Sequence, residues 1–285
     1  MLALSFGPGS TALLHLLSQH LKGQFAKTGR TGYKLHVLHV RMSGDDEGTE
    51  SLERVKTRYP DHEYCTASLA EALDCDGIRS ILPEIPQSED HDNLMTILRR
   101  LGSTTAQADV MQLLLCRLVA ATASRTGCEG ILWGNSTTRL AERTLANAAN
   151  GRGASLPFVT ADGMSLYKVP FFNPMRDLLS KEIASFISIV EPSLDELVVQ
   201  HEQKPMTSTK YTTIDDLMRQ YFEHVEQNYP SIVANVVRTS DKLQAPSLTD
   251  VETQCELCCT PLGANSPEKS RLCHACIVAL SVPDP

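Results

Sequence analysis

The chain has 285 residues, of which 42% are hydrophobic and 21% are charged, so it is long enough for a full α/β core plus a smaller module. Its formal net charge of −8 weighs against a general nucleic-acid binder, although a local basic patch or a partner chain can still supply positive surface. No apolar stretch is long enough to span a bilayer, and the N-terminus lacks the basic region of a signal peptide. We therefore expect a cytoplasmic protein with no membrane association.

Strand and helix patterns alternate over the first 190 or so residues, which predicts a parallel sheet with crossover helices. Strands are expected at residues 2–5, 34–42, 62–65, 130–134 and 166–169, and helices at 11–21, 48–58, 102–125, 136–149, 177–190 and 214–228. The fold class is therefore α/β, with a doubly wound, Rossmann-like sheet. We expect this domain over residues 1–195, a helical extension with linkers over 196–250, and a cysteine-rich segment over 251–285.

The cysteine-rich segment carries a metal-binding pattern. It holds five of the nine cysteines in the last 31 residues, and this clustering argues against a disulfide framework. Two Cys-x-x-C pairs separated by 14 residues predict a tetrahedral site of four thiolates, made by Cys255, Cys258, Cys273 and Cys276. Structural zinc is favoured because a closed site needs no further ligand, but an iron–sulfur cluster suits the same donors. Cys259 and His274 are neighbours that could compete as ligands.

A Gly-rich turn, Ser-Phe-Gly-Pro-Gly-Ser at residues 5–10, follows the first expected strand. Such a turn suits phosphate binding, because its backbone N–H groups and the following helix dipole favour an anion. It resembles the Ser-Gly-Gly-x-Asp-Ser loop of pyrophosphatase-loop adenylating enzymes, with Ser5, Gly7 and Ser10 as matches. Phe6 adds bulk where that loop has Gly, and Gly9 replaces the Asp that could help to order a metal ion near the phosphates.

A second segment, residues 133–143, resembles the Gly-His-Asn-x-Asp-Asp-x-x-Glu-Thr motif of tRNA thiolases. Aligning on Asn135, with a gap of one residue before it, places Thr137 and Thr138 at the paired acids. Glu142 then lies one residue beyond the Glu position. A third segment, residues 171–183, resembles the Pro-Leu … Lys-Glu-Ile stretch of the same enzymes.

These segments in this order, together with the terminal cysteine pairs, resemble the cytoplasmic tRNA 2-thiolation protein 2 family, the degenerate partner of the active thiolase subunit. The resemblance runs nearly end to end. It implies an adenine nucleotide α-hydrolase-like domain of the pyrophosphatase-loop type and a C-terminal, zinc-ribbon-like segment. Family members begin with a cysteine-rich segment before the first strand, whereas this sequence starts at the strand, so a site completed by that segment cannot be read here.

The resemblance also implies partners and chemistry. It implies a heterodimer with the catalytic thiolase subunit, which replaces O2 of the wobble uridine by sulfur in the tRNAs for Lys, Glu and Gln. ATP activates the uridine, and a ubiquitin-related modifier delivers sulfur as a thiocarboxylate. In this chain ATP binding is expected to be residual or to occur only through the partner subunit.

Several of these residues also have simpler roles. Arg139, Arg143, Lys168 and Arg176 are candidate contacts to tRNA phosphates, although a solvated surface charge is the commoner role of such residues. Ser10 suits a helix N-cap as well as a residual nucleotide contact. Thr137 and Thr138 suit a cap and a first helical turn.

The leading hypothesis is a non-catalytic or weakly nucleotide-binding subunit of the thiolation complex. An alternative is an independently active, ATP-dependent tRNA sulfurtransferase whose residual candidates are Ser5, Ser10 and Glu142. Another is a zinc-ribbon interaction module that acts in ubiquitin-like protein modification.

Overall fold

The computed structural model describes residues 1–42, 47–82, 91–163, 165–199, 211–245, 253–262 and 270–281. The strands are β1 (Leu2–Ala3), β2 (His36–Arg41), β3 (Glu63–Ser68), β4 (Ile131–Leu132) and β5 (Phe171–Phe172). The helices are α1 (Pro8–Thr28), α2 (Glu47–Arg58), α3 (Ile78–Ile81), α4 (His91–Arg99), α5 (Thr104–Arg125), α6 (Thr137–Ala149), α7 (Leu156–Thr160), α8 (Ser180–Ile189), α9 (Ile214–Asn228), α10 (Pro230–Ser240) and α11 (His274–Leu280), with short 3₁₀ turns η1 (Leu69–Asp74), η2 (Gly153–Ser155) and η3 (Asp195–Leu197). None of the described helices combines the length and apolarity that a membrane crossing needs.

The strands form one parallel sheet in the order β3-β2-β1-β4-β5, which confirms the predicted doubly wound α/β fold. Leu2 of β1 pairs with Val37 on one side and with Leu132 on the other. The chain therefore winds outward in one direction from β1 to β3 and in the other from β4 to β5. The carboxyl ends of β1 and β4 flank the switch point between these halves, where ligands of open α/β sheets bind.

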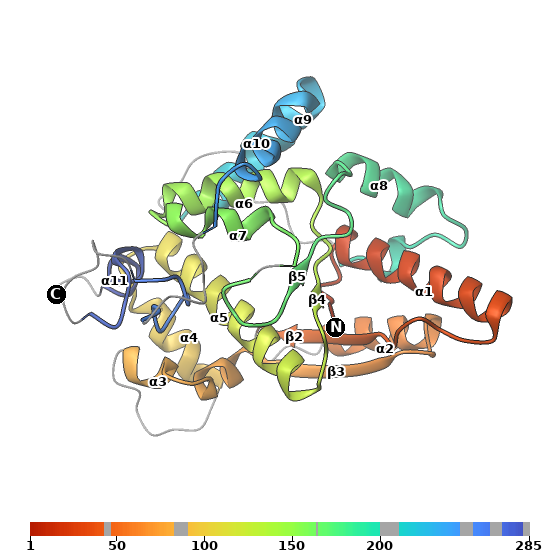
Figure 1. Ribbon diagram of the computed structural model, residues 1–285, viewed down its shortest axis with the longest axis horizontal. Helices are drawn as coiled ribbons and strands as arrows, with labels where there is room; N and C mark the ends of the chain where they lie inside the picture. Colours follow the sequence, from red (N-terminus) through yellow and green to blue (C-terminus); the bar gives the residue numbers. More distant parts are fainter. Residues whose placement is uncertain are drawn as a thin grey trace.

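Helices cover both faces of the sheet (Figure 1). Neighbouring residues of β2 serve opposite faces, as the pleat requires: Val37 packs in the cluster of α1, α2 and α8, and Leu38 in the cluster of α5. Leu14 of α1 and Leu114 of α5 are both fully buried in these two layers. The apolar runs of both helices are therefore explained by burial against the sheet.

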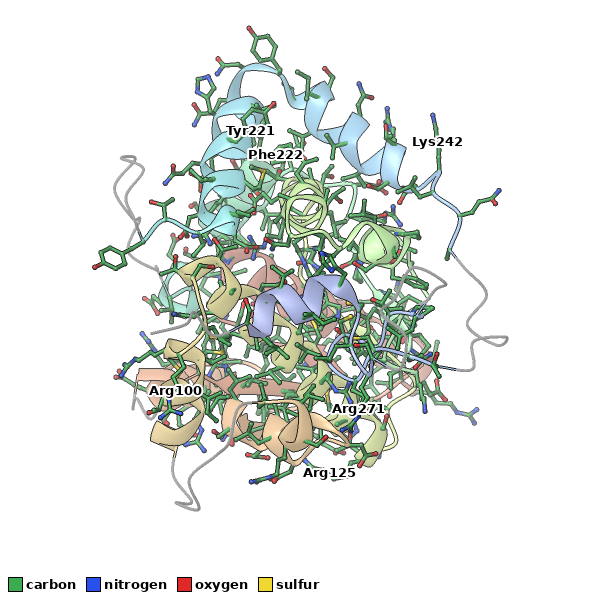
Figure 2. All side chains as sticks on the ribbon, turned by 90° about the vertical axis from the view of Figure 1, so that its left-hand side faces the viewer. Arg100, Arg125, Tyr221, Phe222, Lys242 and Arg271 are labelled. Atoms are coloured by element: carbon green, nitrogen blue, oxygen red, sulfur yellow. The ribbon has the colours of Figure 1, made fainter. Side chains whose placement is uncertain are left out.

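Two further segments lie against this domain. Helices α9 and α10 pack on α6 through a small core that includes Leu140, Phe222 and Val233, and they form an outer edge of the molecule (Figure 2). The cysteine-rich segment packs against α5, and Cys255 and Cys276 belong to the same apolar cluster as the inner residues of that helix. Both segments are therefore attached to the sheet domain through buried side chains.

The expected strand at residues 166–169 is wrong. Lys168 has a φ of 64°, which extended backbone does not allow, and the hydroxyl of Ser165 accepts from the amide of Tyr167 and donates to the carbonyl of Val169. These bonds make a tight turn, and the edge strand is β5, two residues later. Helix α10 lies within the expected helical extension at 196–250, where only the helix at 214–228 was predicted individually. Residues 200–210 of that extension lie outside the described residues.

Candidate functional site

The site lies at the switch point, where the predicted turn at residues 5–10 follows β1 and the predicted motif at residues 133–143 follows β4. Both segments line a cleft of about 940 Å³, which also receives the end of β2 and parts of α8 and α9. The parallel sheet therefore brings together the two segments that the sequence singled out, at the edge where a nucleotide would bind.

Two backbone amides of the turn at residues 5–10 are bound within the turn. The amide of Ser5 donates to the hydroxyl of Ser10 (3.2 Å), and that of Gly7 donates to the hydroxyl of Ser5 (3.4 Å). The Ser10 hydroxyl in turn donates to the Gly7 carbonyl (3.2 Å). Gly7, not Ser10, is the N-cap of α1. The amides of Ser5 and Gly7 thus already have acceptors and are not free for a phosphate.

The start of α1 is pressed against the loop that follows β4. A Cβ atom built on Gly9 would lie 2.0 Å from the carbonyl oxygen of Gly134, and one built on Gly134 would lie 2.4 Å from the amide nitrogen of Ser10. Only glycine fits at either position without a backbone shift. The Asp of the adenylating loop is therefore not merely absent at Gly9: no side chain has room there.

Phe6 occupies the other altered position of the turn. Its φ is 57°, in the left-handed region where glycine is the usual residue, and its side chain is buried. The ring packs against that of His39 at the end of β2, with centroids 4.5 Å apart. His39 is held by a 2.9 Å hydrogen bond between its Nδ1 and the Leu4 carbonyl, and burial lowers its pKa. The pair forms a fixed, uncharged wall of the cleft at neutral pH.

The two threonines at the paired-acid positions act as structural hydrogen-bonding groups. Ser136 is the N-cap of α6, and Thr137 is the first residue of the helix. Thr137 donates to the Arg176 carbonyl (2.5 Å), and Thr138 accepts from the Ser180 amide (3.0 Å). Both threonines are buried. They fix the segment that leads into α8 and offer no charge to a metal ion.

The remaining acid of this motif, Glu142, forms an ion pair within α6. Glu142 is buried and pairs with Arg139 at 2.7 Å. Burial raises the pKa of Glu142, and the nearby Arg139 opposes that rise. Glu142 is not among the residues that line the cleft, whose carboxylates come from α9 as Glu223 and Glu226. Glu226 already accepts from the amide of Lys181 (2.9 Å).

The four predicted tRNA-binding cations lie in different settings. Arg139 is paired with Glu142, and Arg176 is paired with Asp241 (2.5 Å) and Asp162 (3.7 Å). Lys168 is exposed at the turn before β5. Arg143 is half-buried and lines the cleft, and it makes no ion pair with any residue that the structure describes. Their contact with tRNA stays a prediction.

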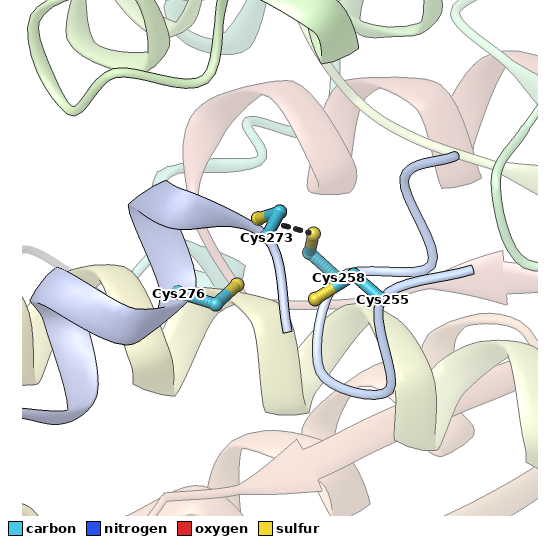
Figure 3. Close-up of side chains that lie close together, drawn as sticks. All are labelled: Cys255, Cys258, Cys273 and Cys276. Atoms are coloured by element: carbon cyan, nitrogen blue, oxygen red, sulfur yellow. Dashed lines mark hydrogen bonds between the residues drawn. The ribbon is translucent and has the colours of Figure 1, made fainter. Parts of the chain in front are cut away.

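The cysteine-rich segment forms a compact cluster of sulfurs (Figure 3). Its members are Cys255 and Cys258 from one knuckle, and Cys273 and Cys276 from the start of α11. All four Sγ atoms lie within 4.8 Å of one another, and those of Cys258 and Cys273 are 3.6 Å apart. A tetrahedral Zn–S length of about 2.3 Å would place sulfurs about 3.8 Å apart, so the arrangement fits a bound metal.

Hydrogen bonds among the four thiols shift their pKa values in opposite directions. They lower the pKa of Cys255 and Cys273 and raise that of Cys258 and Cys276. The guanidinium of Arg152 donates to the Cys276 sulfur (3.2 Å) and is itself held by three bonds to Asp109, two of them 2.9 and 3.1 Å long. Such donors offset the negative charge of a four-thiolate site and fix its ligands. Cys259 and His274 lie outside the four-sulfur group.

The pairing of Arg152 with Asp109 could not be found from the sequence, because 43 residues separate the partners and neither belongs to a motif. The same holds for Arg117 of α5, which donates to the Cys259 sulfur (3.1 Å) and to the Glu256 carbonyl (2.5 Å). These two arginines connect the cysteine segment to the sheet domain through buried or half-buried hydrogen bonds.

Comparisons with known proteins agree with this geometry. A family model described as "Cytoplasmic tRNA 2-thiolation protein 2" matches residues 213–278. Proteins of that name are similar to this chain: 44% identity in Phaeosphaeria nodorum, covering 92% of this chain and 71% of the relative, and 45% in Sclerotinia sclerotiorum, covering 83% and 67%. The U34-tRNA thiolase NcsA from Methanococcus maripaludis, with its 4Fe-4S cluster, shares the fold, with a TM-score of 0.56, 16% identity, and coverage of 97% of this chain and 78% of that one.

The contact between Gly9 and Gly134 predicts opposite effects for two substitutions in one helix. Gly9→Ala forces backbone apart and should lower the free energy of unfolding by about 1–3 kcal/mol. Gly23→Ala, where no atom lies within 4 Å of the new Cβ, should raise it by about 0.5–1 kcal/mol, as expected for a helix interior. Urea unfolding of both variants measures this, and equal stability for Gly9→Ala and the parent chain would contradict the close contact.

The four-sulfur cluster predicts loss of metal when one ligand is changed. Cys276→Ser should reduce bound metal well below one site per chain and should loosen the terminal segment, since metal binding and folding are coupled in such sites. Cys128→Ser, whose sulfur lies outside the cluster, serves as the matched control. Elemental analysis of the purified chains reports the metal content; unchanged content in Cys276→Ser would show that the cluster is not the metal site.

Proposed function

The chain belongs to the cytoplasmic tRNA 2-thiolation protein 2 family, and from this membership we propose that it is the non-catalytic subunit of a cytoplasmic complex that thiolates the wobble uridine, U34, of tRNA. A role in tRNA 2-thiolation follows from the family itself. Beyond the family's role, we propose that this chain is not catalytic, and we also propose its partner and its source of sulfur.

One observation carries the non-catalytic role: the backbone contact of Gly9 with Gly134 fills the place of the carboxylate in the adenylating loop. Activation of the uridine by ATP needs a site that holds the phosphates and a metal ion together. In this chain the loop amides of Ser5 and Gly7 are bound to serine hydroxyls, and the paired-acid positions hold Thr137 and Thr138. The groups needed for activation would then come from a second subunit.

We propose that this second subunit is the active thiolase and that the two related chains form a heterodimer. The substrates would be the tRNAs for Lys, Glu and Gln, and sulfur would arrive as the thiocarboxylate of a ubiquitin-related modifier. In this arrangement the present chain stabilises the active partner and extends its tRNA-binding surface. Arg143 in the cleft and Lys168 on the turn before β5 would contribute to that surface, which is consistent with the net charge of −8 if basic surface is local.

For the cysteine cluster we propose structural zinc. Four thiolates close the coordination sphere and leave no open position for substrate. The segment is short and packs against α5, and a bound metal ion would stabilise a segment of this size. An iron–sulfur cluster accepts the same donors, and its visible absorption would distinguish it from zinc, which is colourless.

Reconstitution with separately purified subunits tests the proposal. With ATP, Mg²⁺ and a thiocarboxylated donor, this chain alone should leave U34 unmodified, whereas the chain combined with the active thiolase should thiolate it faster than the thiolase alone. The measurement is the 2-thiouridine content of digested tRNA. Thiolation by this chain alone would identify an independent enzyme, and capture of the modifier with no effect on tRNA would identify an interaction module instead.

A further inference from the structure

A second, smaller hollow of about 100 Å³ lies beside the cleft, between α5, α6, α7 and the turn that precedes β5. It shares Trp133, Asn135 and Arg143 with the wide cleft, so the two spaces meet along these residues. Its far end reaches Cys258 of the metal cluster. The hollow is therefore an extension of the cleft, and the turn at residues 5–10 does not line it.

One wall of this hollow is aromatic. The rings of Trp133 and Phe171 lie 5.5 Å apart at 61°, and those of Phe171 and Tyr167 lie 5.7 Å apart and nearly parallel, at 19°. Faces of this kind stack with planar rings, and stacking on aromatic side chains is the usual way in which proteins hold an unpaired base. The wall favours a flat ligand.

Hydrogen-bonding groups surround the same space. The indole N–H of Trp133 is buried and has no acceptor among the described residues. Asn135 donates from Nδ2 to Oδ1 of Asn173 (2.8 Å), which leaves its carbonyl oxygen as an acceptor. Trp133 and Asn135 both line the hollow, so together they offer one donor and one acceptor, the groups that alternate along a pyrimidine edge.

The charges that line the hollow nearly cancel. Arg152 is bound to Asp109, and Arg139 is bound to Glu142. Arg143 remains without an ion pair in the described parts of the chain, and Asp215 on the rim offsets it. A neutral ring is therefore a better match than a phosphate group, and Arg143, at the junction with the cleft, is placed to stack on the ring or to meet the ribose-phosphate that leads out of it.

We propose that this hollow binds one unstacked pyrimidine base of the tRNA, with the adjoining backbone running out through the cleft. The proposal rests on the proposed function for the identity of the RNA. The hollow measures about 100 Å³ before it opens into the wide cleft, so the single ring of a pyrimidine matches it better than the two fused rings of a purine. Trp133, Asn135 and Arg143 are the recognition residues.

The fluorescence of Trp133 reports directly on occupancy, because it is the only tryptophan in the chain. Titration of the full chain with uridine should quench it saturably. Adenosine should require a concentration roughly tenfold higher or more, and inorganic phosphate should have no effect. Arg143→Ala should weaken uridine binding about tenfold, and Arg143→Lys should weaken it less, because lysine keeps the charge but not the planar group. Arg238→Ala, an exposed change on α10, should leave binding unchanged.

Three results would overturn the base pocket: no quenching by uridine, equal quenching by adenosine, or unchanged affinity in both Arg143 variants. Circular dichroism confirms folding, and Arg143→Lys keeps the test valid if Arg143→Ala misfolds. Thiolation by the two-subunit complex separates the two proposals. If U34 is thiolated while uridine fails to quench Trp133, the pocket is wrong and the proposed function stands; if the complex neither binds nor thiolates tRNA, the proposed function is wrong.

Discussion

The backbone of Gly9 and that of Gly134 touch at the switch point of the sheet, and the properties of the site depend on this contact. A parallel sheet places the ends of β1 and β4 side by side. When both following turns lack a Cβ atom, they close onto each other and leave no room for the carboxylate of an adenylating loop. At this edge of the sheet, where ligands bind in related folds, the turn after β1 therefore packs against the loop after β4, while the surrounding fold is kept.

Other residues of the former site have become structural. Ser5 and Ser10 satisfy the amides of the turn, and Thr137 and Thr138 hold the segment before α8. Neutral hydroxyls in these places make short hydrogen bonds within the protein and add no repulsion between buried charges. The domain therefore keeps a cleft of about 940 Å³ whose carboxylates come from α9 and not from the two motifs.

The sequence predicts much of this architecture but not its contacts. The succession of strands and helices along the chain and the grouping of the four cysteines follow from periodicity and spacing, because these are local patterns. The edge strand was predicted at residues 166–169. The backbone of Lys168 in this run has a positive φ, which interrupts an extended strand, and the edge strand is instead β5. The meeting of Gly9 with Gly134, and the bonds of Arg152 to Asp109 and Cys276, join residues far apart in the chain, and only the folded backbone reveals them.

We infer that the turn at residues 5–10 is closed to nucleotide. Calorimetric titration of the purified chain with ATP and Mg²⁺ tests this inference most directly. We expect no saturable heat at ATP concentrations up to about 1 mM. Saturable binding in the micromolar range that Ser10→Ala weakens would contradict it, because the phosphates would then occupy the turn that the contact of Gly9 with Gly134 is said to close.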